Sequence, residues 1–235
     1  MVDISAPRTA RARARAELTR EIKDAARRQL GEVGPAALSL RAVARELGMV
    51  SSAVYRYFPS RDELLTALIV DAYASVGDAA AAAESAVERS DLTGRWLAIA
   101  VAFRQWARGR PQEYALIFGS PVPGYQAPAD TIDPAGRIPV LLLAIVDESS
   151  RRHGRVQKGE DQPRIPKSLR ADLLALGGQL APEASDVLLA RAVMAWSELV
   201  GLVSFELFGH LHNAIHDYET HFEYQMRVIA AGLGL

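Results

Sequence analysis

The chain has 235 residues, 49% of them hydrophobic and 23% charged, which is the balance of a soluble globular protein with one or two domains. It contains no cysteine, which excludes disulfides, zinc–thiolate sites and cysteine nucleophiles and favours a reducing compartment. The net charge of −1 hides an asymmetry: the first 60 residues carry 11 Lys and Arg against 6 Asp and Glu, and the remainder carries 16 against 22. A basic N-terminal quarter indicates an anionic partner for that quarter alone.

The chain opens on a basic segment that lacks the apolar stretch of a signal peptide. No apolar run elsewhere reaches the roughly 18 residues of a transmembrane helix, so we expect a cytoplasmic protein without membrane contact. Residues 8–17, RTARARARAE, place four arginines two or three residues apart. They form either the solvated start of a helix or an arm for the backbone or minor groove of a nucleic acid.

Three helices are expected in the first 60 residues. Apolar residues at helical spacing predict the first over residues 12–31. Ser39 is a candidate N-cap for a short second helix, and Gly48 ends it in the usual left-handed position. A third helix follows and closes at Pro59. Two short helices joined by a tight turn and packed on a longer one describe a helix-turn-helix unit.

The third helix, VSSAVYRYF, has two different faces when its residues are placed at about 100° intervals. One face holds Val50, Ala53, Val54, Tyr57 and Phe58. The opposite face holds Ser51, Ser52, Tyr55 and Arg56, and no acid intervenes before Asp62. The first face is a core candidate. The second is either a solvated polar surface or a nucleic-acid surface, on which hydroxyls and first-turn N–H groups meet phosphates and base edges.

Residues 38–69, LSLRAVARELGMVSSAVYRYFPSRDELLTALI, resemble the DNA-binding segment of the tetracycline-repressor (TetR) family of bacterial regulators. The matching residues are Ser39, Ala44, Leu47, Gly48, Val54, Tyr55, Tyr57, Phe58, Ser60, Arg61, Glu63 and Leu64. The resemblance implies an all-α homodimer whose N-terminal domains occupy successive major grooves of a palindromic operator, and whose C-terminal domain binds a small effector. Together with the exposed face of the third helix, it assigns the DNA contacts to Ser39, Arg41, Ser51, Ser52, Tyr55, Arg56, Tyr57 and Arg61.

One position departs from the family pattern. Many members carry a polar residue where this chain has Val50, so the usual cap of the recognition helix is missing. Ser51 either caps the helix in its place or reads bases.

A long connecting helix follows, because Ser60 and Glu63 are spaced as a capping box. We expect a helix-turn-helix domain over 1–60, a connecting helix over 61–84, and an effector-binding and dimerisation domain over 85–235. Strand-like alternation is absent, so the second domain is expected to be a helical bundle. Its predicted helices span 92–108, 111–119, 137–152, 167–177, 183–213 and 217–232.

Residues 92–235 resemble the C-terminal domain of one TetR subgroup, through FRQWARGRPQEYALIFGSPVPGY and LVGLVSFELFGHL. This likeness implies a fold and a dimer but no particular ligand. Large apolar residues are candidates either for the lining of an effector cavity or for plain core. They are Trp96, Phe103, Trp106, Tyr114, Phe118, Leu142, Met194, Trp196 and Phe205.

The last two predicted helices carry apolar residues on more than one side, which favours a four-helix interface between two copies. The interface candidates are Leu202, Phe205, Leu211, Phe222, Met226 and Ile229. His212 and His216 are spaced to share a metal on one helix face. No carboxylate stands at a recognisable offset from them, so we expect no metal and no cofactor.

These features predict a DNA-binding transcriptional regulator, a homodimeric repressor released from its operator by a small, largely apolar effector. The alternative is a DNA-binding protein that is constitutive or controlled by a protein partner. An enzyme is not expected, because the sequence has no cysteine, no Gly-rich phosphate loop and no recognisable Ser/His/acid arrangement.

Overall fold

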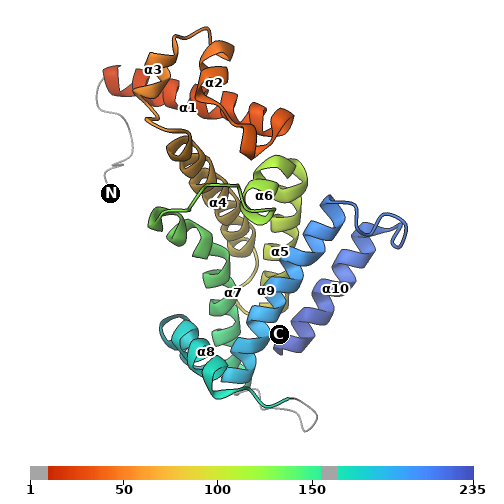
Figure 1. Ribbon diagram of the computed structural model, residues 1–235. Helices are drawn as coiled ribbons and strands as arrows, with labels where there is room; N and C mark the ends of the chain where they lie inside the picture. The colour runs from red at the N-terminus through yellow and green to blue at the C-terminus, as the bar shows by residue number, and fades with distance from the viewer. Residues whose placement is uncertain (1–9, 155–162) are drawn as a thin grey trace. The chain divides into compact units, whose positions relative to one another are not determined.

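The computed structural model describes residues 10–154 and 163–235, and in this part of the chain all regular structure is helical (Figure 1). The all-α fold expected from the sequence is confirmed. The start of the arginine-rich segment, with Arg8, and the polar stretch 155–162 lie outside the described residues. The α-helices are α1 (Ala10–Val33), α2 (Leu40–Glu46), α3 (Ser51–Tyr55), α4 (Arg61–Ser85), α5 (Leu92–Gly109), α6 (Pro111–Phe118), α7 (Ile132–His153), α8 (Lys167–Leu180), α9 (Asp186–Leu207) and α10 (Tyr218–Leu233). Two 3₁₀ turns, η1 (Pro35–Ala37) and η2 (Ala129–Thr131), stand between them.

The chain divides into two compact units. Unit 1 takes in the chain up to Ala72 together with Gln112–Thr131, and unit 2 comprises Tyr73–Pro111 and Ile132–Leu235. Helix α4 therefore belongs partly to each unit, and nearly all of α6 belongs to unit 1. The domain limits expected near residues 60 and 84 stay a prediction.

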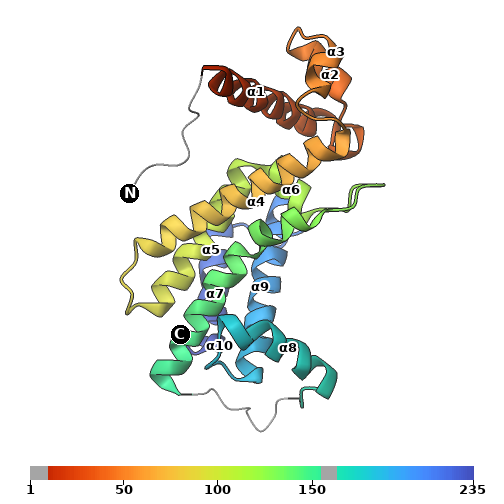
Figure 2. The ribbon, with the colours of Figure 1, turned by 90° about the vertical axis from the view of Figure 1, so that its left-hand side faces the viewer.

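Unit 1 contains the expected helix-turn-helix, in which α2 packs on α1 and α3 packs on α2 (Figure 2). Its core includes Ile22, Val43 and Val54, all fully buried. The turn depends on Gly48, whose φ is +64°, because L side chains avoid that conformation. The N–H of Met49 then donates to the carbonyl of Ala44 over 2.8 Å and closes the helix end.

The start of α4 and its contact with α1 are both fixed by polar side chains. Ser60 Oγ accepts from the N–H of Glu63 at 3.1 Å, as the capping box predicts. Further along α4, Asp71 Oδ2 lies 2.7 Å from both Lys23 Nζ and Arg27 Nη2 of α1. These ion pairs hold α1 against α4 beside the apolar core.

In unit 2, α5 is the central helix and packs on α7, α9 and α10, while α8 lies across α7 and α9 (Figures 1 and 2). Phe103 and Leu199 are fully buried between these helices. Trp96 is also buried, and its Nε1–H donates to the carbonyl of Met226 on α10 over 2.9 Å. A buried indole N–H needs such a partner, so this bond fixes how α10 lies on α5.

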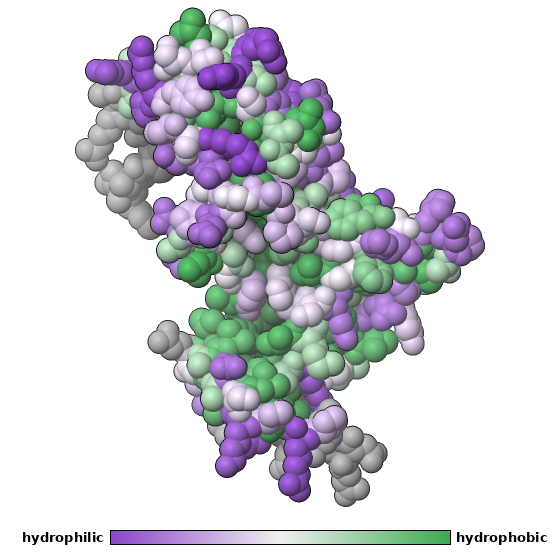
Figure 3. Space-filling view, viewed as in Figure 1, coloured by the Kyte–Doolittle hydropathy of each residue, from purple (hydrophilic) through white to green (hydrophobic). Residues whose placement is uncertain are grey.

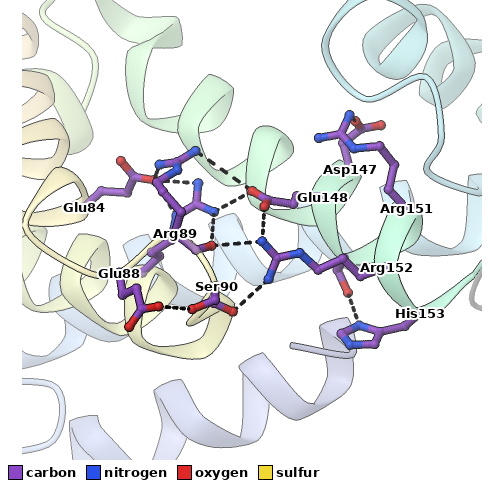
Figure 4. Close-up of polar contacts among 11 residues, drawn as sticks. Glu84, Glu88, Arg89, Ser90, Asp147, Glu148, Arg151, Arg152 and His153 are labelled. Atoms are coloured by element: carbon purple, nitrogen blue, oxygen red, sulfur yellow. Dashed lines mark hydrogen bonds and ion pairs between the residues drawn. The ribbon is translucent and has the colours of Figure 1, made fainter.

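A buried arginine joins three helices of unit 2. Arg95 of α5 is 1% exposed, and its guanidinium lies 2.6 Å from Glu84 of α4 and 2.7 Å from Glu148 of α7. Arg89 and Arg152 also point at this pair of acids (Figure 4). Burial lowers the pKa of Arg95, but its hydrogen bonds to Glu148 and Glu84 raise the pKa by more, so the group stays charged.

A second buried arginine fixes the end of α9. Arg104 donates to Glu206 of α9 over 2.7 Å and to Glu219 of α10 over 2.6 Å, and its guanidinium lies 4.8 Å from the ring centre of Phe222. Burial lowers the pKa of Arg104, and the hydrogen bonds to both acids raise it by more. Glu206, near the end of the largely apolar α9, therefore pairs inside the chain.

Two helix ends differ from expectation by five residues or more. Helix α9 ends at Leu207 rather than 213, because Gly209 adopts a φ of +77° and the N–H of His210 closes on the carbonyl of Phe205. Helix α7 begins at Ile132 rather than 137. Pro134 lies in its first turn, where no N–H is needed, so the proline does not delay the helix.

Candidate nucleic-acid interface

The first turn of α3 has no side-chain cap. Val50 occupies the N-cap position in an extended conformation, and the helix begins at Ser51. Of the two alternatives for Ser51, the capping role is excluded, because Ser51 is itself the first helical residue. The open N–H groups of this turn are left for an acceptor outside the helix, such as a phosphate oxygen.

The two faces of α3 separate as the sequence predicts at Val54 and Phe58, but not at Val50, a core-face candidate that is 70% exposed at the N-cap of the helix. Val54 is fully buried and Phe58 is 7% exposed, so both belong to the core of unit 1. Tyr55 is 40% exposed, and Ser52 and Arg56 are also exposed. The outward face therefore presents two hydroxyls and a guanidinium without an acid among them.

Tyr57 lies between the two faces. It is half-buried, and the guanidinium of Arg15 in α1 stacks 4.9 Å from the centre of its ring. Sequence reasoning did not find this contact, because nothing in the sequence shows that the start of α1 reaches the end of α3.

The other predicted DNA contacts lie at helix starts of unit 1. Ser39 is the N-cap of α2, yet its side chain makes no capping bond; its own N–H donates to Gln29 Oε1 over 3.3 Å. Arg41 is exposed in the first turn of α2. Arg61 has a structural role that the sequence did not indicate: its Nη2 donates to the carbonyls of Pro35 over 2.8 Å and Ala36 over 3.2 Å.

These features agree with comparisons to known proteins. Residues 22–68 match the family model for bacterial regulatory proteins of the tetR family, and residues 96–229 match the tetracyclin repressor-like C-terminal domain. The chain belongs to the TetR family of transcriptional regulators. It is therefore a DNA-binding regulator and not an enzyme, as expected from its sequence.

Relatives of this TetR-family chain span nearly its whole length. The HTH-type transcriptional regulators Rv1816 of Mycobacterium tuberculosis and Mb1846 of Mycobacterium bovis are each 37% identical over 223 residues, which is 94% of either chain. A solved structure assigned to a regulatory protein, SCO4313, is 34% identical, with a TM-score of 0.75 over 95% of this chain and all of the other. A TetR-family regulator from Shewanella sp. PV-4 is 15% identical and shares the fold, with a TM-score of 0.58 over 92% of this chain and 95% of its own.

Two helices in the described part of the chain, α4 and α9, are long and apolar enough to cross a membrane by length and composition. From the sequence we expected no such stretch. Of their most apolar windows, 44% and 33% are buried. A core helix of a soluble protein passes the same test, and DNA-binding regulators of the TetR family are soluble, so we assign no membrane span.

Unit 2 of this TetR-family chain contains an apolar pocket of about 230 Å³ between α7, α8 and α9. Hydrophobic side chains gather over this part of the surface (Figure 3). Trp196 forms one wall, and an edge-to-face contact with the buried Phe103, 5.5 Å between ring centres, supports it from behind. The pocket is lined by Pro139, Leu142, Leu143, Leu176, Ala192, Val193 and Trp196.

The nine predicted effector residues do not meet in one place. Leu142 and Trp196 line the pocket between α7, α8 and α9, and Phe103 supports Trp196. Met194 lies in a separate groove between α9 and α10. The buried Trp96 and Trp106 make hydrogen bonds within unit 2, Phe205 is half exposed on α9, and Tyr114 and Phe118 belong to unit 1.

The predicted interface residues also differ in their exposure. Phe222, Met226 and Ile229 are buried within the chain against its own helices, so packing inside one copy already accounts for them. Phe205 is 51% exposed. Leu202 and Leu211 are partly buried. Among the described residues, no group of three His, Cys, Asp or Glu is placed to hold a metal ion.

Proposed function

We propose that this TetR-family regulator is a cytoplasmic homodimer that represses transcription at a palindromic operator and leaves the DNA when a small, largely apolar effector binds. DNA binding through α3 is supported chiefly by the two different faces of this helix. Val54 is buried and Tyr55 faces outward, and the first turn has no side-chain cap. The proposed DNA contacts are Ser39, Arg41, Ser51, Ser52, Tyr55, Arg56, Tyr57 and Arg61. Among them, Arg61 acts chiefly by holding η1 against the start of α4.

The outward side of α9 supports the homodimer. Met194 and Phe205 are more than half exposed there, and Gly201 lies between them on the same side. This side is mostly apolar, but the exposed Glu198 falls about 40° from Met194, and Arg191 falls about 60° from it. On α10, Tyr224 and Val228 are at least half exposed. A groove of about 360 Å³ runs between the two helices, and the same helices of a second copy would fill it as a four-helix interface.

The apolar pocket supports control by an effector. An uncharged hydrocarbon or aromatic group suits it, because its lining offers contact area but almost no hydrogen-bonding group. Val193 and Trp196 line the pocket, and Met194, next to Val193 in the chain, faces the proposed partner. A ligand that displaces α9 would thus change the dimer and the spacing of its recognition helices, which must match half-sites about 34–36 Å apart.

Selection of bound fragments from a random DNA pool tests the DNA-binding mode. We expect a palindromic site with two half-sites, and enrichment of a single half-site would contradict the dimer. Enrichment of no sequence would contradict sequence-specific binding.

Release of the selected operator tests the effector pocket. Naphthalene is a suitable probe because it is apolar and small enough for about 230 Å³. We expect it to release DNA from the native chain but not from Ala192→Met, in which the new side chain fills part of the pocket. An operator that no apolar molecule releases would instead favour a DNA-binding protein that is constitutive or controlled by a protein partner.

A further inference from the structure

The N-terminal half of α1 has two faces of different charge. At about 100° per residue, Arg11 and Arg15 fall within about 40° of the buried Ile22, on the side that packs against the helix-turn-helix. Arg13 and Arg20 fall on the opposite side. Among the charged residues in the first turns of α1, only arginines therefore lie on the side toward α2 and α3.

The acids of α1 follow the other side. Glu17 and Asp24 fall within about 60° of Arg13 and Arg20, Glu21 is about 100° from Ile22, and Arg20 pairs with Glu17 at 3.5 Å. Within the described part of the chain, neither Arg11 nor Arg15 makes an ion pair, and both are exposed. Arg11 and Arg15 are thus two unpaired positive charges on the same side of α1 as Ile22, in the part of the helix that lies beyond the core.

The stack on Tyr57 shows where these charges lie. The guanidinium of Arg15 is 4.9 Å from the ring centre of Tyr57, at the end of the recognition helix. A cation over a ring face is held by the charge distribution of the ring, and this contact does not use up the N–H groups that donate to phosphate oxygens. Arg11 is one helical turn further out on the same side.

We infer that Arg11 and Arg15 extend the DNA-binding surface to backbone phosphates that flank the bases facing α3, and that the Tyr57 ring positions Arg15 for its contact. Phosphate is the acceptor favoured here, because Arg15 lies beside the end of the recognition helix and not in its first turn, whose residues face the bases. These contacts add affinity and register but little sequence preference.

The test compares two double variants with the same loss of charge on the same helix: Arg11→Ala with Arg15→Ala, and Arg13→Ala with Arg20→Ala. Binding of the full chain to the selected operator is measured over a range of salt concentrations. For the first pair, the slope of log affinity against log salt should become shallower by about 1.8 for each bound subunit, since each lost phosphate contact removes about 0.9. The second pair should keep the native slope. Alanine favours helix, so we expect circular dichroism to show that both variants are folded.

A hydroxyl-radical footprint gives an independent readout. The first pair should lose protection of the sugar–phosphate backbone beyond the half-site, with the central protection retained. A native slope for this pair would overturn the inference. An equal decrease for both pairs would also overturn it, because the effect would then be that of net charge and not of a contact.

The positioning role of Tyr57 is tested by a double-mutant cycle. Tyr57→Leu removes the ring, and we expect it to weaken DNA binding less in the Arg15→Ala background than in the native chain. Arg15→Lys keeps the charge without the planar stack, and should restore only part of the affinity lost in Arg15→Ala. Equal effects of Tyr57→Leu in both backgrounds would show that the two side chains do not act together.

Discussion

Adjacent residues of α3 have opposite roles, because a helix turns each side chain by about 100° from the one before it. Val54 is fully buried and Tyr55 is 40% exposed. Substitutions on this helix should therefore affect either stability or DNA affinity, according to the face that they alter. The sequence alone predicts this division at Val54 and Phe58, although Val50, on the same side of the wheel, is 70% exposed.

Tyr55→Ala should weaken binding to the selected operator by about 10- to 100-fold, because one hydrogen bond to a charged group contributes about 1.5–3 kcal/mol. Its melting temperature should stay close to that of the native chain. Phe58→Ala, three residues further along, should instead lower the free energy of unfolding by about 3–5 kcal/mol, since its ring is 7% exposed. Gel-shift titration and thermal unfolding of both variants measure the two effects. A Tyr55→Ala variant with native affinity would contradict the assignment of this face to DNA.

Single helices were predictable where their signals are local. The glycine after α2 and the serine before α4 mark ends that the structure confirms. The contacts that join helices were not predictable in the same way. Arg61 meets the carbonyl of Pro35 26 residues earlier, and Arg95 meets Glu148 53 residues later. From the sequence, a charged residue in a helix is expected to be exposed, because its partner is distant in the chain. The buried ion pairs of unit 2 therefore could not be predicted from a sequence pattern.

The turn between α2 and α3 should depend on the backbone of one residue. Gly48 has a φ of +64°, and a Cβ built there would meet nothing within 4 Å. Gly48→Ala should therefore destabilise the chain through backbone strain alone, by about 1–2 kcal/mol. Gly136→Ala is the matched control, because Gly136 lies inside α7 with equally open space and no positive φ. It should stabilise the chain by up to about 1 kcal/mol. Urea unfolding of both variants measures the difference, and a Gly48→Ala variant as stable as the native chain would show that the turn relaxes without cost.

The Arg95 cluster should make unit 2 sensitive to acid. Burial raises the pKa of Glu148, but the hydrogen bond from Arg95 and the charge of Arg152 lower it by more, so the pKa lies below its ordinary value. A carboxyl with a lowered pKa in the folded state contributes stability that is fully present above its ordinary pKa, and that is lost as the pH falls through the lowered value. The melting temperature should therefore drop below about pH 4.5. Glu148→Gln should be less stable at pH 7 and should show a smaller drop in that range. An unchanged pH profile in Glu148→Gln would exclude this carboxyl as a source of the acid sensitivity.

At the scale of the whole molecule, α9 presents a surface that one copy of the chain leaves uncovered. Met194 is 59% exposed, and the half-exposed Phe205 lies on the same side of the helix. Large exposed apolar groups are a feature of interfaces, because water contact with them is unfavourable, although the exposed Glu198 lies between these two on the same side. The residues buried inside the chain, such as Met226, cannot serve this purpose. Sequence periodicity predicted that the last two helices have surplus apolar faces, but it did not show which side the chain covers by itself.

Met194→Glu should therefore convert the dimer to a monomer without unfolding it, because a second carboxylate beside Glu198 would lose its hydration in the interface but keeps it in the free chain. Sedimentation velocity should give a mass near that of one 25.5 kDa chain, where the native protein should give twice that mass. Binding to the palindromic operator should weaken far more than binding to a single half-site, since only a dimer engages both half-sites at once. Ala82→Glu adds the same charge at an exposed position of α4 and should change neither mass nor affinity. A Met194→Glu variant that remains dimeric would place the interface on another surface, and a native protein that sediments as one chain would contradict the homodimer itself.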